Sequence, residues 1–152
     1  MMTADPFIDE TSRVLTAEAF EFVLTNELKR AVRSQNFLTL LVIEPLHQAS
    51  DDDRARAVRQ IARLISPEVR ETDLISENER GRLSLVLLDA DLPSSMRVID
   101  RLLTRLEHYE FPNPTAIDLG AACCPTHGAD VESLRRAAET RPVQHRREAG
   151  GV

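Results

Sequence analysis

One apolar run constrains the fold of this chain more than any other feature. The seven residues Phe37-Leu-Thr-Leu-Leu-Val-Ile43 contain one hydroxyl group and no charge. Such a run is too short for a surface helix, and its continuous apolar character is typical of a strand that is covered on both faces. We therefore expect a buried central strand here. Pro45 is expected to end it, because proline cannot donate a hydrogen bond to a neighbouring strand.

Apolar periodicity divides the rest of the chain into helices and strands. The expected helices span about 17–33, with Phe20, Val23, Leu24, Leu28, Ala31 and Val32 on the core side, then Asp51 to Pro67, Asp91 to Leu106 and Asp130 to Pro142. Aspartates 51–53 are suited to cap the second helix. The other expected strands are 72–76, 83–88 and 115–124. The order strand, helix, hairpin, helix, strand predicts a ferredoxin-like α+β fold, a mostly antiparallel central sheet flanked by helices.

Length and composition set the domain organisation. The 152 residues suit one domain, expected over 16–141, after an irregular lead-in at 1–15. Residues 142–152 are polar, so we expect a flexible tail, and Pro142 speaks against a final edge strand. The start has no signal-peptide pattern and no apolar run is long enough for a membrane span.

Net charge and cysteine content limit the classes of partner and the cellular compartment that we expect for this chain. The net charge of −6 argues against nucleic acid as a partner. Cys123 and Cys124 are adjacent, where a disulfide is strained, so free thiols and a cytoplasmic location are expected. The basic residues Arg135, Arg136, Arg141, Arg146 and Arg147 indicate either a solvated helix face or a surface for an acidic partner.

Several segments, in order, resemble one known family, the GGDEF domain of diguanylate cyclases. The opening 9–20, the R-x-x-D segment 69–75, the strand and turn 85–92, and the end 119–137, with Leu119-Gly-Ala-Ala122 and Leu134-Arg-Arg-Ala137, are each similar to the family pattern. The resemblance covers nearly the whole chain. It implies the nucleotidyl-cyclase-like α+β fold and a place in bacterial cyclic di-GMP signalling.

The family's signature pentapeptide is lost. Counting from Asp73 places it at Glu79-Arg80-Gly81-Arg82-Leu83, where no residue keeps its family identity. The family uses acids there, with an aspartate at the end of the first strand, to hold two divalent cations against GTP. Glu44 keeps the strand-end acid, but Arg82 stands where an acid is needed. Glu44 and His47 alone are too few ligands for a metal. We therefore expect no metal site, no cofactor and no cyclase activity.

One binding motif survives at Arg70 and Asp73. Their spacing matches the R-x-x-D of the family's inhibitory site, which binds cyclic di-GMP, and arginine and aspartate suit phosphate and guanine edges. The same tetrapeptide is also consistent with an ordinary surface ion pair.

Three functions remain open at this point. The leading hypothesis is an inactive GGDEF-like domain that acts as a regulatory or protein-interaction module, with another signalling protein as partner and a homodimer as a further candidate. The alternatives are a cyclic di-GMP receptor acting through Arg70 and Asp73, and a residual GTP-binding allosteric domain.

Overall fold

A computed structural model describes residues 8–9, 14–78, 81–112, 115–140 and 147–148. The helices are α1 (Ala17–Ser34), α2 (Asp51–Ile65), α3 (Leu92–Glu107) and α4 (Val131–Thr140), with a 3-10 turn η1 (Ser66–Glu68). The strands are β1 (Ile8–Asp9), β2 (Val14–Leu15), β3 (Leu38–Leu46), β4 (Leu74–Glu77), β5 (Leu83–Leu88), β6 (Ala116–Cys124) and β7 (Arg147–Glu148).

The strands form one sheet in the order β1-β2-β4-β5-β3-β6-β7. Every pair is antiparallel except β2 with β4. The inner order β4-β5-β3-β6 with crossover helices α2 and α3 is the ferredoxin-like arrangement, so the predicted fold class is confirmed.

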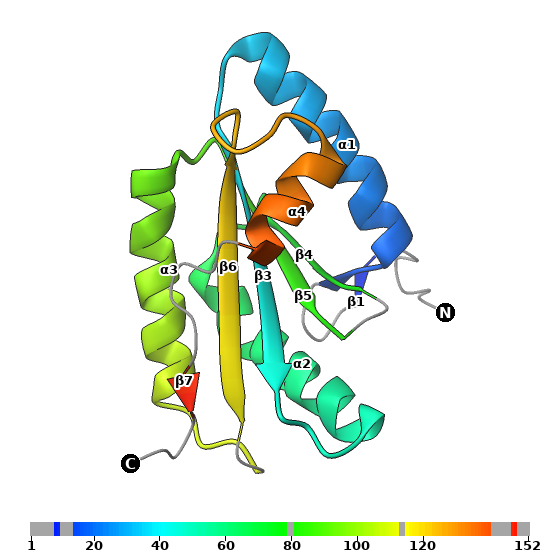
Figure 1. The fold of residues 1–152 in the computed structure, drawn as a ribbon, viewed down its shortest axis with the longest axis vertical. Helices are drawn as coiled ribbons and strands as arrows, with labels where there is room; N and C mark the ends of the chain where they lie inside the picture. The colour runs from blue at the N-terminus through cyan, green and yellow to red at the C-terminus, as the bar shows by residue number, and fades with distance from the viewer. Residues whose placement is uncertain (1–7, 10–13, 79–80, 113–114, 141–146, 149–152) are drawn as a thin grey trace, which may run out of the picture.

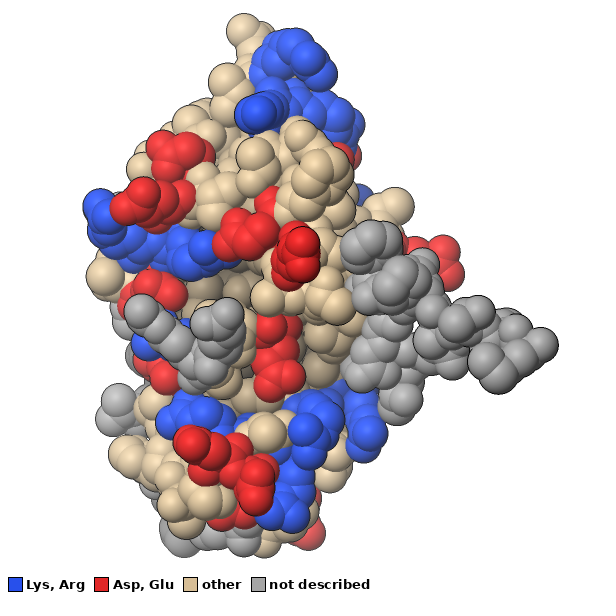
Figure 2. All heavy atoms as spheres, turned by 90° about the vertical axis from the view of Figure 1, so that its right-hand side faces the viewer, with Lys and Arg blue, Asp and Glu red and all other residues tan. Residues whose placement is uncertain are grey.

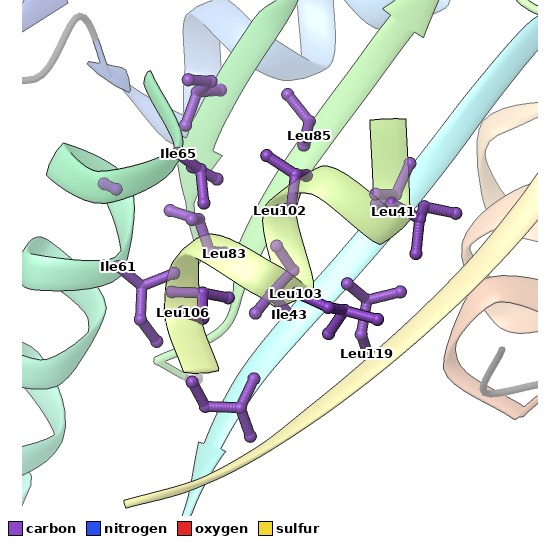
Figure 3. Packing of buried hydrophobic residues seen from close by; sticks show 14 of the residues in the cluster. Leu41, Ile43, Ile61, Ile65, Leu83, Leu85, Leu102, Leu103, Leu106 and Leu119 are labelled. Atoms are coloured by element: carbon purple, nitrogen blue, oxygen red, sulfur yellow. The ribbon is translucent and has the colours of Figure 1, made fainter. Parts of the chain in front are cut away.

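Helices cover both faces of the sheet (Figure 1). Leu41 and Ile43 of β3 belong to the core beneath α2 and α3, which Figure 3 shows from close by. Leu40 and Val42 belong to the core beneath α1 and α4. Because successive side chains of a strand point to opposite faces, β3 supplies both cores, as its apolar run predicts.

Side-chain caps begin the helices where local chemistry predicts. Thr16, Ser50 and Asp91 accept hydrogen bonds from the backbone N–H groups of Ala19, Asp53 and Ser94. The hydrogen bond from Ser94 lowers the pKa of Asp91. The cap of α2 is therefore Ser50, and the three aspartates predicted to cap this helix lie in its first turn.

Pro45 does not end its strand, contrary to the prediction, because β3 continues to Leu46 and pairs with β6 throughout. The N and C=O groups of a strand residue point to the same side. On that side β5 pairs no further than Ile43, and the Pro45 carbonyl accepts a hydrogen bond from Arg54 at 3.2 Å. The missing N–H therefore costs no bond between strands.

Some boundaries and core assignments differ from the predictions. Val32 and Phe37, expected in the core, are 50% and 44% exposed, because α1 ends and the chain turns before β3 reaches the sheet interior. Thr72 and Asp73 form a turn, so β4 begins at Leu74.

The two ends of the chain add short strands that the sequence did not predict. Val14–Leu15 pairs with β4 through Ser76, so the lead-in is not wholly irregular. Arg147–Glu148 pairs with the start of β6, so an edge strand does form at these two tail residues. None of the described helices has the length and apolar character needed to cross a membrane.

We predict that Leu85→Ala destabilises the protein by about 2–5 kcal/mol, because Leu85 is fully buried in the central sheet and the change leaves a cavity. Urea denaturation measures the loss. Phe22→Ala is the control, since Phe22 is 70% exposed and should change stability by about 0.5 kcal/mol or less. Equal losses in the two variants would contradict this assignment of the core.

Candidate functional site

The hairpin between β4 and β5 contains residues 79–83, which the sequence predicts to correspond to the family's signature. Its loop is closed by a 2.9 Å hydrogen bond from the Asn78 N–H to the Arg82 carbonyl and a 3.1 Å bond from the Arg82 N–H to the Asn78 side chain. Gly81 has φ +72°, which favours glycine, and a Cβ there would lie 2.4 Å from Cδ of Arg54. The hairpin therefore rests directly on the Arg54 side chain. Glu79 and Arg80 lie outside the described residues.

Four charged side chains form a chain of ion pairs beside this hairpin. Arg82 Nη1 lies 2.9 Å from Glu139 Oε2, and Arg82 Nε lies 3.4 Å from Glu44 Oε2. Arg54 Nη1 lies 3.6 Å from the same Glu44 oxygen. The Glu44 carboxylate at the end of β3 is thus held between two guanidinium groups, and Arg82 connects it to α4.

This arrangement suits a structural brace better than a divalent cation. Hard cations such as Mg²⁺ are held by several oxygen ligands, whereas Glu44 faces two positive groups. Among the described residues, no group of three His, Cys, Asp or Glu side chains could hold a metal ion. Leu83, the last signature position, is fully buried in the core.

The structure brings Arg70 and Asp73 together in the turn before β4. The Asp73 side chain, only 3% exposed, accepts hydrogen bonds from the backbone N–H groups of Arg70 at 3.0 Å and Leu88 at 3.1 Å. Arg70 Nη2 lies 3.3 Å from Asp73 Oδ1 and also donates to the Leu88 carbonyl. Asp73 therefore joins the turn to the end of β5.

The Arg70 side chain remains 60% exposed and lines a groove of 490 Å³ between η1 and α3. Arg101 of α3 lines the same groove, and its Nε lies 3.4 Å from Glu68. Arg101 could not be predicted as a site residue from the sequence, because no motif connects it with Arg70, about thirty positions away. The groove presents two guanidinium groups with a carboxylate beside each.

A second groove, of 760 Å³, lies between α1, the hairpin strands and α4. Arg135, part of the predicted basic cluster, forms a 2.6 Å ion pair with Glu21 of α1 across this groove. Arg136 pairs within α4 with Glu132 at 2.9 Å. Both described arginines of the cluster are therefore neutralised locally; the other three members lie outside the residues whose side chains are described.

Glu77, at the hairpin end of β4, is an acid whose pKa the fold raises. Burial raises the pKa of its carboxyl group, and the Arg59 guanidinium of α2 partly offsets this rise. Arg59 thus stands close enough to the hairpin to act electrostatically on it.

Solved structures of GGDEF domains share this fold. A DGC protein from Thermotoga maritima matches with a TM-score of 0.73 and 16% identity, over 89% of this chain and 100% of that one. The GGDEF domain of PA1120 (TpbB or YfiN) from Pseudomonas aeruginosa matches with a TM-score of 0.69 and 20% identity, over 87% of this chain and 84% of that one.

Diguanylate cyclase SiaD from the same bacterium, solved in complex with its activator SiaC, matches with a TM-score of 0.71 and 17% identity, over 88% of this chain and 55% of that one. No protein-family model and no curated protein matches the sequence. The chain therefore has the GGDEF-domain fold, as the resemblance implied. Sequence identities of 16%, 17% and 20% establish a shared fold, but they do not establish a shared activity, ligand or partner.

We predict that Asp73→Asn lowers the free energy of unfolding by about 1–3 kcal/mol, because an amide NH₂ group would face a backbone N–H that now donates to a carboxylate oxygen. Urea denaturation measures the change. Arg70→Ala should cost only about 0–1 kcal/mol, since its side chain is largely solvated. A larger loss for Arg70→Ala than for Asp73→Asn would contradict the structural role given to Asp73.

Proposed function

We propose that this protein is a catalytically inactive GGDEF-fold domain that acts as a regulatory or protein-interaction module in bacterial signalling. The observation that carries the proposal is the position of Arg82, whose guanidinium pairs with Glu44 at the point where the family places its metal ligands. The carboxylate retained from that site is already used by Arg54 and Arg82.

Electrostatics supports the loss of activity. A unit positive charge about 4 Å from a divalent cation costs roughly 8 kcal/mol at an effective dielectric constant near 20, before the side chain moves away. Phosphoryl transfer from GTP relies on metal ions that neutralise developing charge. The same argument disfavours the residual GTP-binding domain, because the arginines beside the hairpin are neutralised by Glu44 and Glu139 rather than open to a triphosphate.

A role in protein interaction is consistent with what is known of one protein of this fold. SiaD was solved in complex with its activator SiaC, so a chain containing this fold does assemble with another protein. By analogy we take the partner of the present chain to be another signalling protein, with a second copy of the chain as the other candidate.

We predict that the purified chain forms no cyclic di-GMP from GTP in the presence of Mg²⁺ or Mn²⁺, because Glu44 faces two arginines and no group of three His, Cys, Asp or Glu side chains among the described residues could hold a metal ion. Chromatography of the nucleotides after prolonged incubation measures the product. A cyclase with an intact signature, assayed in parallel, is the positive control. Product that disappears in the Glu44→Gln variant would overturn the proposal.

A cyclic di-GMP receptor is the second candidate, favoured by the groove that exposes the Arg70 and Arg101 guanidinium groups together. Guanidinium groups suit phosphates and guanine edges. Against it, the Asp73 oxygens already accept hydrogen bonds from the protein's own backbone, so Asp73 would have to exchange these bonds for guanine N–H groups.

The receptor hypothesis predicts that the chain binds cyclic di-GMP with micromolar or tighter affinity. This binding should disappear in Arg70→Ala, because the change removes the most exposed cation of the groove. Isothermal titration calorimetry measures it. Arg97→Ala is the control, since Arg97 is exposed on α3 and does not line the groove. A folded sample that gives no heat at high ligand concentration would exclude the receptor and leave the interaction module.

A further inference from the structure

A third groove runs along α2, on the side that faces the chain between α3 and β6. Three of its lining residues are the exposed arginines Arg56, Arg59 and Arg63 of α2. Spacings of three and four residues place these side chains in one stripe, about 10 Å long at the rise of an α-helix. We call this site the arginine groove. In Figure 2, basic side chains gather beside acidic ones on the lower part of the face, where α2 lies.

The opposite wall of the arginine groove is largely apolar. Phe111 and Pro112, which follow α3, line it together with Thr115. Phe111 is half-buried, packs against the core and meets Tyr109 edge to face with a 4.8 Å distance between ring centroids. The groove has a volume of 630 Å³, so a cationic wall and a fixed aromatic wall enclose room for a chain segment.

The charge of this groove is only partly compensated. Asp53 pairs with Arg56 at 3.3 Å. Arg59 acts on Glu77 electrostatically, but neither Arg59 nor Arg63 forms an ion pair with a carboxylate among the described residues. The arginines beside the hairpin and on α4 are matched with nearby acids, whereas the arginine groove of this chain with net charge −6 carries two guanidinium groups without such an ion pair among the described residues.

We propose that the arginine groove docks an acidic, extended segment of a partner protein. This proposal rests on the interaction role proposed above and names the surface and the chemistry of the partner. Carboxylates on one side of the segment would pair with Arg59 and Arg63, and apolar side chains on the other side would pack on Phe111. Such a segment matches both the charge and the apolar wall. The net charge of −6 disfavours a nucleic acid as the alternative occupant.

The dimensions fit an extended peptide. Alternate residues of an extended chain lie roughly 6–7 Å apart on the same side. Residues three or four positions apart in a helix are separated by about 4.5–6 Å along its axis. Glutamates at alternate positions can therefore follow the arginine stripe, while the residues between them face the wall formed by Phe111 and Pro112.

The test uses a fluorescein-labelled peptide of alternating glutamate and leucine, titrated with the full chain and followed by fluorescence anisotropy at low and high salt. We expect micromolar binding that weakens with salt and falls about tenfold or more in Arg59→Glu/Arg63→Glu. The matched control is Arg97→Glu/Arg105→Glu, which changes the net charge equally on the exposed surface of α3 and should stay within about twofold of the unmodified chain. Thermal melts establish that both variants are folded.

Two further probes separate the chemistries. A peptide of alternating glutamate and serine should bind more weakly than the leucine peptide, because it lacks contact with Phe111. A short single-stranded DNA that binds as tightly as the leucine peptide, and loses affinity in Arg59→Glu/Arg63→Glu, would overturn the proposal in favour of a nucleic-acid surface.

No binding of the leucine peptide, or equal loss in the two charge-reversed variants, would also overturn it. Turnover of GTP, by contrast, bears on the proposed function alone. Failure of the docking surface and failure of the inactive-domain assignment are therefore separate results.

Discussion

The structure depends on β3, a strand that must be covered on both faces and paired on both edges. Its neighbours are β5 and β6, which form the centre of the sheet, and its alternate side chains enter the two cores. An uncovered face of such a strand would expose apolar side chains to water, and an unpaired edge would expose backbone N–H and C=O groups. Helices on both faces and long strands on both edges follow from it.

The end of β3 also positions a group of paired charged side chains. β3 continues through Glu44 and Pro45, beyond Ile43, the last residue that β5 pairs with. Arg54 and Arg82 occupy the space there, the first through the Pro45 carbonyl and the Glu44 carboxylate, the second through Glu44 and Glu139. The Glu44 carboxylate at the end of β3 is thus paired with two of the protein's own guanidinium groups. These ion pairs add side-chain contacts to the backbone pairing that already holds the hairpin in the sheet.

Local chemistry explains which parts could be predicted from the sequence. The strand β5 and the start of α3 after Asp91 matched the predictions, since a short, mostly apolar run and an aspartate cap act within a few residues. The continuation of β3 through Pro45 could not be predicted, because it depends on where β5 begins to pair. The strands β2 and β7 are two residues each, too short to carry a pattern.

The same distinction between local and long-range contacts applies to the candidate site. The pairing of Arg70 with Asp73 followed from their spacing, but the bond between Asp73 and Leu88 joins the turn before β4 to the end of β5 and has no local signal. The partners of Arg82, Glu44 and Glu139, are nearly forty and nearly sixty positions away. Only the folded sheet shows that Arg82 is a brace rather than a solvated side chain.

Charge compensation separates the surfaces that hold this protein together from those open to a partner. Arg82 and Arg135 form ion pairs with Glu139 and Glu21, which belong to other elements of the fold. A partner protein that covered such a pair would remove water from both charges, and neither charge would gain a new ion pair in return. Arg59 and Arg63 form no such ion pair among the described residues, so a carboxylate of a partner protein would form a new ion pair with them. Their position opposite Phe111 adds apolar area to that gain. Two guanidinium groups on one face of α2 that have no carboxylate partner among the described residues therefore make the arginine groove a favourable docking surface for an acidic segment.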